Sequence, residues 1–371
     1  MGKDCSLPTV LVDKKRLDQL AAQICCLEKA SSSYEERITE NETRITEIEE
    51  GCCDPDNPPI PGTDCDPICT KIGFYADSGI ANADQILLWN RIQLLNPDML
   101  LMGGDNTYTN PATCEEQQAD AEIFAPYRQL GMLFPALGNH DLDVDSDAAC
   151  HNALYPYLPN NGRYYRVSFP ERSLDIFVLN SGRQTGSPGT LVEPDGNDLN
   201  SVQYQWFVEQ ATLSQAKHKI VMFHHPWFSQ QSSAVSGAQY LPEMDWKFEN
   251  YGIDLVINGH NHLTVHHEWK GVNYVQASVS VQSARDFRGD QDQTYGLPFG
   301  AMVWQDDRNG LSGEDMMGYI ELTDRAMHVR FVDTLDGTLQ HEFGIVNDRP
   351  FICEFTEEPN CPCSYISYGS Q

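Results

Sequence analysis

Residues 71 to about 350 alternate short apolar runs with stretches of helical periodicity. Such alternation predicts an α/β fold, in which helices cover the faces of a sheet. The apolar runs expected to be buried strands are 71–76, 98–104, 132–139, 174–180, 218–225 and 253–260. Helices are expected at 81–95, 114–130 and 201–215, and later runs at 271–281, 318–324 and 327–334 have the period of antiparallel strands.

Five of these apolar runs end in side chains that commonly bind metal ions. In chain order they deliver Asp77; Asp105 and Tyr108; Asn139, His140 and Asp141; His224 and His225; and His260 and His262. Taken singly, each group is typical of a turn or a helix cap. All five in order are not expected by chance. Because ligands of open α/β sheets bind beyond the carboxyl ends of the strands, the pattern predicts a dinuclear metal site at one rim.

The ordered set resembles the calcineurin-like metallophosphoesterase superfamily, and within it the purple acid phosphatases. The family blocks D-x-G, G-D-x-x-Y, G-N-H-[DE], V-x-x-H and G-H-x-H correspond to residues 77–79, 104–108, 138–141, 221–224 and 259–262. The resemblance covers roughly residues 71 to 335 and implies a β-sandwich flanked by helices (αββα). Most of the superfamily has D-x-H in the first block. Here Gly79 replaces that histidine, and Tyr108 is the ligand that the purple acid phosphatase pattern supplies instead.

The resemblance also implies a ligand set and a reaction. Asp77, Asp105, Tyr108 and His262 would bind a first metal, and Asp105, Asn139, His224 and His260 a second. A phenolate is a hard donor that suits Fe(III), with Fe, Zn or Mn as the second ion. The expected chemistry is hydrolysis of a phosphate ester by a hydroxide held on the metals.

Two histidines are expected to assist this reaction without binding metal. His140 would stabilise the phosphoryl group or aid proton transfer. Family members usually carry further histidines after the fourth block, but the segment from Pro226 to Tyr240 has none. His225 and His151 are the candidates to replace them. This departure leaves open whether the substrate is a monoester or a diester.

Residues 17–50 carry a heptad pattern with apolar residues at alternating spacings of three and four. The pattern predicts a parallel coiled coil, and the isoleucines in the seam favour a homotrimer. A single amphipathic helix packed on the body is the alternative. We therefore divide the chain into a coiled coil (1–50), a Cys- and Pro-rich linker (51–70), a metallophosphoesterase domain (71–350) and a Cys-rich tail (351–371).

Charge and cysteine content restrict the partners and the location. The formal net charge of −30 disfavours nucleic-acid phosphates and anionic lipid surfaces. No apolar run is long enough to span a bilayer, and the first ten residues lack the apolar core of a signal peptide, although Gly2 and Ser6 fit the permissive myristoylation pattern. The 12 cysteines favour disulfides, chiefly near the chain ends, over reduced thiols or a zinc site.

Two classes of function remain open from the sequence. The first is an active dinuclear phosphohydrolase with a phosphate-ester substrate. The second is an oligomeric attachment protein, such as a virion appendage, that displays a phosphatase-like head with weak or no activity. An extracellular or virion-associated location is expected in the second case. The order of the five blocks favours the enzyme.

Overall fold

The computed structural model describes residues 70–79, 83–108, 114–144, 148–182, 195–228, 241–279, 301–305, 316–323 and 325–346. All of them belong to the second of two compact units, Asp66–Gln371, the first being Met1–Cys65. The predicted coiled coil, nearly all of the linker and the C-terminal tail lie outside the described residues. Their structure and the predicted domain boundaries stay predictions.

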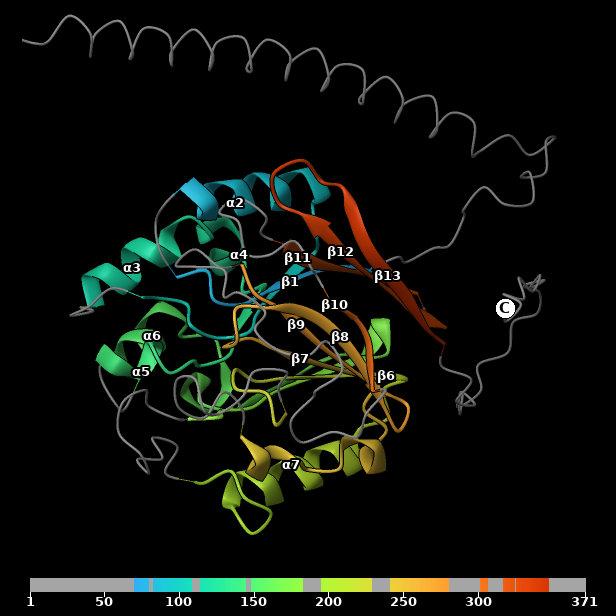
Figure 1. Cartoon of the computed structure of the whole chain (residues 1–371). Helices are drawn as coiled ribbons and strands as arrows, with labels where there is room; N and C mark the ends of the chain where they lie inside the picture. Colours follow the sequence, from blue (N-terminus) through green and yellow to red (C-terminus); the bar gives the residue numbers. More distant parts are fainter. Residues whose placement is uncertain are drawn as a thin grey trace, which may run out of the picture. The chain divides into compact units, whose positions relative to one another are not determined.

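Two sheets form the centre of this unit (Figure 1). One has six strands in the order β13-β12-β11-β1-β2-β3, and the other has seven in the order β10-β8-β9-β7-β6-β5-β4. Strands β1, β2 and β3 are parallel, as are β5, β6, β7 and β9. The strands are β1 (Thr70–Tyr75), β2 (Met99–Met102), β3 (Leu133–Pro135), β4 (Tyr165–Phe169), β5 (Leu174–Val178), β6 (His218–Met222), β7 (Leu255–Asn258), β8 (Thr264–Trp269), β9 (Val272–Ala277), β10 (Met302–Gln305), β11 (Met316–Leu322), β12 (Ala326–Asp333) and β13 (Leu339–Val346).

Helices cover the sheets. The α-helices are α2 (Ala83–Leu95), α3 (Cys114–Glu122), α4 (Ala125–Gln129), α5 (Asp141–Val144), α6 (Ala149–Leu154) and α7 (Val202–Leu213). Short 3-10 turns are η1 (Pro159–Gly162), η2 (Pro170–Arg172), η3 (Pro242–Met244) and η4 (Phe248–Tyr251). Ser201 is the N-cap of helix α7, and its side chain accepts a hydrogen bond from the N–H of Tyr204.

Alternate residues of the central strands face two different apolar layers. In β5, Ile176 and Val178 belong to the core between the sheets, whereas Phe177 packs with Phe207 of α7. Strands β6 and β7 divide their residues in the same way. Because both faces are buried, these strands read as continuous apolar runs rather than alternating ones. The mixed α/β architecture with two sheets agrees with the predicted metallophosphoesterase fold.

Most predicted elements lie within a few residues of the observed ones, but two predictions were wrong or incomplete. The helix predicted at 114–130 is two helices, α3 and α4, separated at Ile123 and Phe124. Pro126 lies in the first turn of α4, where its missing N–H costs nothing, whereas inside a continuous helix it would remove a hydrogen bond. Strands β4, β8, β10 and β13 were not assigned from the sequence.

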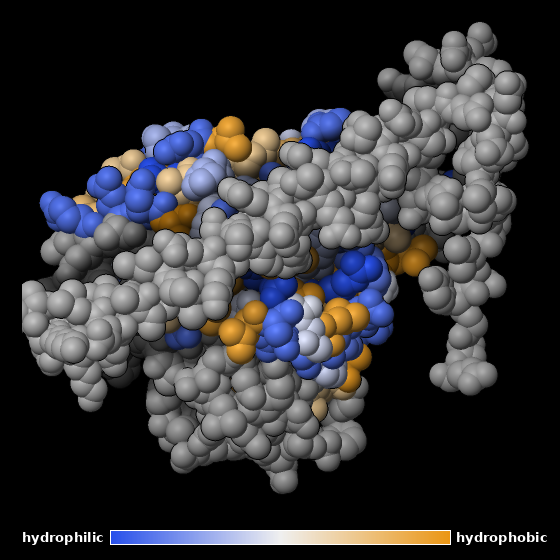
Figure 2. Space-filling view, turned by 90° about the horizontal axis from the view of Figure 1, so that it is seen from above, coloured by the Kyte–Doolittle hydropathy of each residue, from blue (hydrophilic) through white to orange (hydrophobic). Residues whose placement is uncertain are grey.

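Where described residues are visible in Figure 2, hydrophilic and hydrophobic residues are interspersed. Exposed large apolar side chains include Ile86 and Leu94 on α2, Val202 and Leu213 on α7, and Val346 on β13. Among the helices that the structure describes, none has the length and apolar character required to cross a membrane.

Candidate metal centre

The predicted ligands follow the carboxyl ends of strands in both sheets. Strands β1, β2 and β3 of the six-stranded sheet lead to the oxygen donors, which are Asp77, Asp105, Tyr108 and Asn139. Strands β6 and β7 of the seven-stranded sheet lead to the imidazoles, which are His224, His260 and His262. The two sheets meet here through a parallel bridge between Ala76 and Ser278. The site therefore lies where two sheets converge, and not along the rim of one open sheet.

Three of the predicted ligands for the first metal are in direct contact. The Tyr108 hydroxyl lies 3.2 Å from Oδ1 of Asp77 and 3.0 Å from Nε2 of His262. All three side chains are buried. One phenol, one carboxylate and one imidazole thus converge on a common point, although they come from three different loops.

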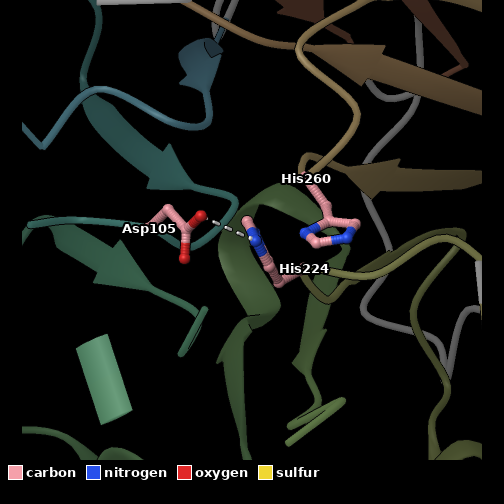
Figure 3. Close-up of side chains that lie close together, drawn as sticks. All are labelled: Asp105, His224 and His260. Carbon is pink, nitrogen blue, oxygen red and sulfur yellow. Dashed lines mark ion pairs between the residues drawn. The ribbon is translucent and has the colours of Figure 1, made fainter. Parts of the chain in front are cut away.

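The predicted ligands for the second metal form an adjoining group. Donor atoms of Asp105, His224 and His260 all lie within 4.8 Å of one another. Figure 3 shows the His224 ring between the Asp105 carboxylate and the His260 ring. Oδ1 of Asn139 is 3.0 Å from Nδ1 of His260. The backbone N–H of His260 also donates to both oxygens of Asp77, at 3.0 and 3.1 Å, which joins the two groups.

The orientation of His224 suits a metal ligand. Its Nδ1 is 2.9 Å from the carbonyl oxygen of Gly103, which can only accept, so Nδ1 carries a proton. Nε2 lies 3.2 Å from Oδ2 of Asp105 but has no hydrogen-bond partner in the described part of the chain. Metal-binding histidines typically donate one ring N–H to a carbonyl and offer the other nitrogen to the ion. The residues present therefore fit a bound cation.

The electrostatics of the site also favour a cation. Burial would raise the pKa of Asp105, but the charge and close contact of His224, together with the charges of His140 and His260, outweigh burial and hold this pKa well below its ordinary value. Burial would lower the pKa of His224, but the charge and close contact of Asp105, together with the charge of Asp77, raise it to about 9. Burial and the charge of Asp77 raise the pKa of Tyr108, whereas burial and His225 lower that of His260. No described Lys or Arg forms an ion pair with Asp77 or Asp105. The negative charge of these buried carboxylates therefore favours a bound cation.

The ligand loops are tight and strained. Four of the predicted ligands have positive φ: Asp77 (59°), Asp105 (53°), His260 (71°) and His262 (53°). This region is costly for residues other than glycine, and such strain gathers at functional sites. A Cβ at Gly138 would lie 2.1 Å from the Asp105 nitrogen, and one at Gly259 would lie 2.9 Å from Oδ2 of Asp77. Both glycines therefore permit the close approach of ligand-bearing backbone.

Two residues that support the ligands were not identified from the sequence. Ser278, which follows β9, donates its hydroxyl to Oδ2 of Asp77. Asp141 was noticed as part of G-N-H-D but given no role. Its carboxylate accepts the N–H groups of Asn106, Thr107 and Gly138 and so ties the loop after β2 to the loop after β3. Burial and the charge of Asp105 raise the pKa of Asp141 to about 8, which the N–H donors partly oppose.

The predicted assisting histidines occupy different environments. His140 is only partly buried, and its ring centre is 4.6 Å from that of Tyr108. His225 is buried, with Nδ1 2.8 Å from Oγ of Ser181 and its ring centre 4.1 Å from that of His260. His151 lies on α6, where its ring packs against Tyr155. Of the three, only His140 combines nearness to the ligands with exposure.

The solved structures similar to this chain include phosphatases. The anchor protein GAP50 of the Plasmodium inner membrane complex matches with a TM-score of 0.55 and 14% identity, over 76% of this chain and 90% of that one. Purple acid phosphatase PPD1 from yellow lupin seeds matches with a TM-score of 0.56 and 13% identity, over 78% of this chain and 55% of that one. This chain thus spans about half of the lupin enzyme. At these identities the likeness shows the fold alone, and no curated protein matches the sequence.

The family assignment rests on the sequence itself. The family model for calcineurin-like phosphoesterases matches residues 70–263, which is more than half of the chain. The matched segment contains all five strand-end blocks and every predicted metal ligand. The chain accordingly belongs to the calcineurin-like phosphoesterase family.

Proposed function

We propose that this protein is a dinuclear metal-dependent phosphohydrolase that cleaves phosphate esters and whose first metal site is of the purple acid phosphatase type. The family is one of phosphoester hydrolases, so the finer proposal concerns the two metals and their ligands. The observation that carries it is the contact of the Tyr108 hydroxyl with both Asp77 and His262. In this proposal Tyr108 takes the ligand role of the histidine that is absent at Gly79.

The protein's contribution is to hold the donor atoms and to shape the access to them. Asp77, Asp105, Tyr108 and His262 would hold the first ion, and Asp105, Asn139, His224 and His260 the second. When bound, two such ions supply Lewis-acid polarisation of the phosphoryl oxygens and activation of water. The phenol and carboxylates suit Fe(III) in the first site, with Fe, Zn or Mn in the second.

We assign different roles to the two assisting histidines. His140 is exposed enough to contact a substrate, and its backbone N–H donates to Oδ1 of Asp105 at 2.9 Å. Its ring would donate a hydrogen bond to the phosphoryl group or carry a proton. His225 contacts Ser181 and faces the ring of His260. Those contacts favour a role of His225 in orienting His260 over donation of a proton to the leaving group. The catalytic role predicted for His225 from the sequence stays a prediction.

Hydrolysis of a chromogenic phosphate monoester and the matching diester by the metal-loaded protein tests the proposal. We expect Asp105→Asn to lower kcat/KM at least about 100-fold, since even residues that only support metal ligands are worth 10- to 100-fold. Asp175→Asn is the matched control, because Asp175 is a buried aspartate that pairs with Arg166 at 2.7 Å, away from the ligands. Equal rates for Asp105→Asn and the parent protein would refute the assignment.

The second candidate function is that of an oligomeric attachment protein with this domain as its head. The heptad pattern of residues 17–50 favours it, with an extracellular or virion-associated location as its corollary. The two functions are compatible, since a trimer can present an active enzyme. A metal-loaded protein with no activity toward either ester would favour the structural role.

A further inference from the structure

Strand β5 ends beside the metal centre but carries no predicted ligand. It pairs in parallel with β6, which leads to His224 and His225. Neighbouring parallel strands bring the residues that follow them to the same edge of a sheet. Ser181 is the third residue after β5 and is completely buried. Ser181 therefore lies next to the loop that carries these two histidines.

The Ser181 hydroxyl contacts both the backbone and the ring of His225. Its Oγ accepts a hydrogen bond from the backbone N–H of His225 at 3.0 Å and lies 2.8 Å from Nδ1 of the ring. His225 is only 2% exposed, so water competes little for these contacts. Because one side-chain atom meets two parts of the same residue, it restricts the rotation of the His225 ring about its side-chain bonds.

Helix α7 and the segment before it hold the loop that carries Ser181. Oε1 of Gln203, a fully buried residue of α7, accepts the backbone N–H of Asn180 at 2.8 Å. Nε2 of Gln203 donates to the carbonyl oxygens of Asn180 and Gly196, each at 3.0 Å. Nδ2 of Asn197 donates to the carbonyl oxygen of Ser181 at 2.9 Å. The backbone at Ser181 is therefore fixed independently of its hydroxyl, which leaves the hydroxyl to act on His225.

His225 in turn packs against the imidazole of His260. Their ring centres are 4.1 Å apart, whereas the ring centre of His224 is 5.0 Å from that of His225. Metal-binding histidines usually donate their second ring N–H to a carbonyl or carboxylate, as His224 does to Gly103. In the described part of the chain, no such acceptor contacts His260, whose Nδ1 lies 3.0 Å from Oδ1 of the predicted ligand Asn139. The packing of His225 therefore supplies at His260 the orientation that a hydrogen bond supplies at His224.

We propose that Ser181 is a positioning residue that orients His260, through His225, for the second metal ion. This role rests on the proposed dinuclear site and adds to it a residue that binds no metal. Binding of the first ion should change little, because its predicted ligands form a separate group around Tyr108. The effect of Ser181 should therefore be confined to the second ion.

Zn²⁺ binding to the full chain, with ferric iron already in the first site, tests the proposal. Zn²⁺ is titrated in competition with a chelating indicator. We expect Ser181→Ala to weaken Zn²⁺ binding about 10-fold, the lower end of the roughly 10- to 100-fold effect of residues that support metal ligands. The visible band of the ferric ion should keep its intensity. Ser214→Ala is the matched control and should bind Zn²⁺ like the parent protein, since Ser214 is also buried but its hydroxyl donates to Asp175, which pairs with Arg166.

A double-mutant cycle tests whether Ser181 acts through His225. His225→Phe keeps a planar ring but has no nitrogen for the Ser181 hydroxyl, and alone it should also weaken Zn²⁺ binding. In that background Ser181→Ala should cause little further loss, whereas additive losses would overturn the proposal. Equal Zn²⁺ affinities of Ser181→Ala and the parent protein would overturn it as well. A parent protein that binds no second ion would refute the dinuclear site itself, and this role with it.

Discussion

Tyr108 and Gly79 depend on each other at the metal centre. The N–H of Tyr108 donates to the carbonyl oxygen of Gly79 at 2.7 Å, and a Cβ at Gly79 would lie 2.2 Å from the Thr107 nitrogen. The loop that carries Tyr108 therefore occupies the space that a side chain at residue 79 would need. The same backbone arrangement therefore excludes a histidine at residue 79 and places Tyr108 at the site.

The role of Tyr108 has a spectroscopic test. With ferric iron bound, a phenolate ligand should give a charge-transfer band in the visible range. We expect Tyr108→Phe to lose this band, because the phenol oxygen that faces Asp77 and His262 is removed. Tyr165→Phe is the control, since Tyr165 is also buried but its hydroxyl donates to the carbonyl oxygen of Pro135. A band that survives in Tyr108→Phe would show that another residue binds the iron.

Ser278 is expected to matter although it binds no metal in our proposal. Its hydroxyl donates to Asp77, and removing a group that orients a metal ligand typically costs 10- to 100-fold in metal affinity. Calorimetric titration of the metal-free protein should therefore show weaker binding by Ser278→Ala, with Ser278→Thr restoring most of the affinity. If the alanine and threonine variants bind metal equally well, the hydroxyl does not orient Asp77.

His266 should make stability depend on pH. Burial lowers its pKa to about 4, and its Nδ1 lies 3.0 Å from Nε2 of His341, whose pKa burial also lowers. In the unfolded chain a histidine titrates near 6.5. Below pH 6.5 the unfolded chain binds a proton that the folded chain does not, so stability falls until about pH 4, by about 2 kcal/mol between pH 7 and 5. Denaturant titrations at pH 7 and pH 5 measure the free energy of unfolding. Between these pH values, the decrease for His266→Gln should be about 2 kcal/mol smaller than the decrease for the parent protein. Equal decreases for the two proteins would exclude this contribution of His266.

At the scale of elements, the disulfide between Cys114 and Cys150 joins α3 to α6 across 36 residues of sequence. A loop of that size corresponds to about 3–4 kcal/mol of stabilisation in the chain-entropy model. The double change Cys114→Ser and Cys150→Ser should lower Tm by about 10 °C. Addition of a thiol reductant should affect the parent protein in the same direction and leave the double variant unchanged. A reductant effect of equal size on both proteins would point to other cysteines.

The elements that the sequence predicted well are those buried on both faces. Strands β5, β6 and β7 are continuous apolar runs because they lie between two apolar layers, and that pattern is easy to recognise. Strand β13 is a sheet edge in which Ile345 is the only buried residue of the eight, so its apolar periodicity is weak. The contacts among the predicted ligands could be anticipated because each of these residues follows a strand closely. Ser278 was not, since its role arises from a bridge to Ala76, about 200 residues away in the chain.

At the scale of the whole molecule, the oligomeric state is the open prediction. A homotrimer of the 41.8 kDa chain would have a mass of about 125 kDa in light scattering. We expect that mass at micromolar concentration, because a heptad of this length favours assembly. A double variant with Ile38→Asp and Ile45→Asp, which places charges at two positions of the predicted seam, should have the mass of a monomer. A monomeric parent protein would support the lone amphipathic helix instead.

The convergence of the two sheets has a consequence for fragments of this domain. Among the predicted ligands, the carboxylate, phenol and amide donors come from residues before 140, whereas the imidazoles come from residues after 223. A chain severed between them would leave each fragment with an incomplete coordination set. Only reassociation of the two fragments would restore the full set of predicted ligands. Metal binding would therefore measure directly whether the fragments have reassociated.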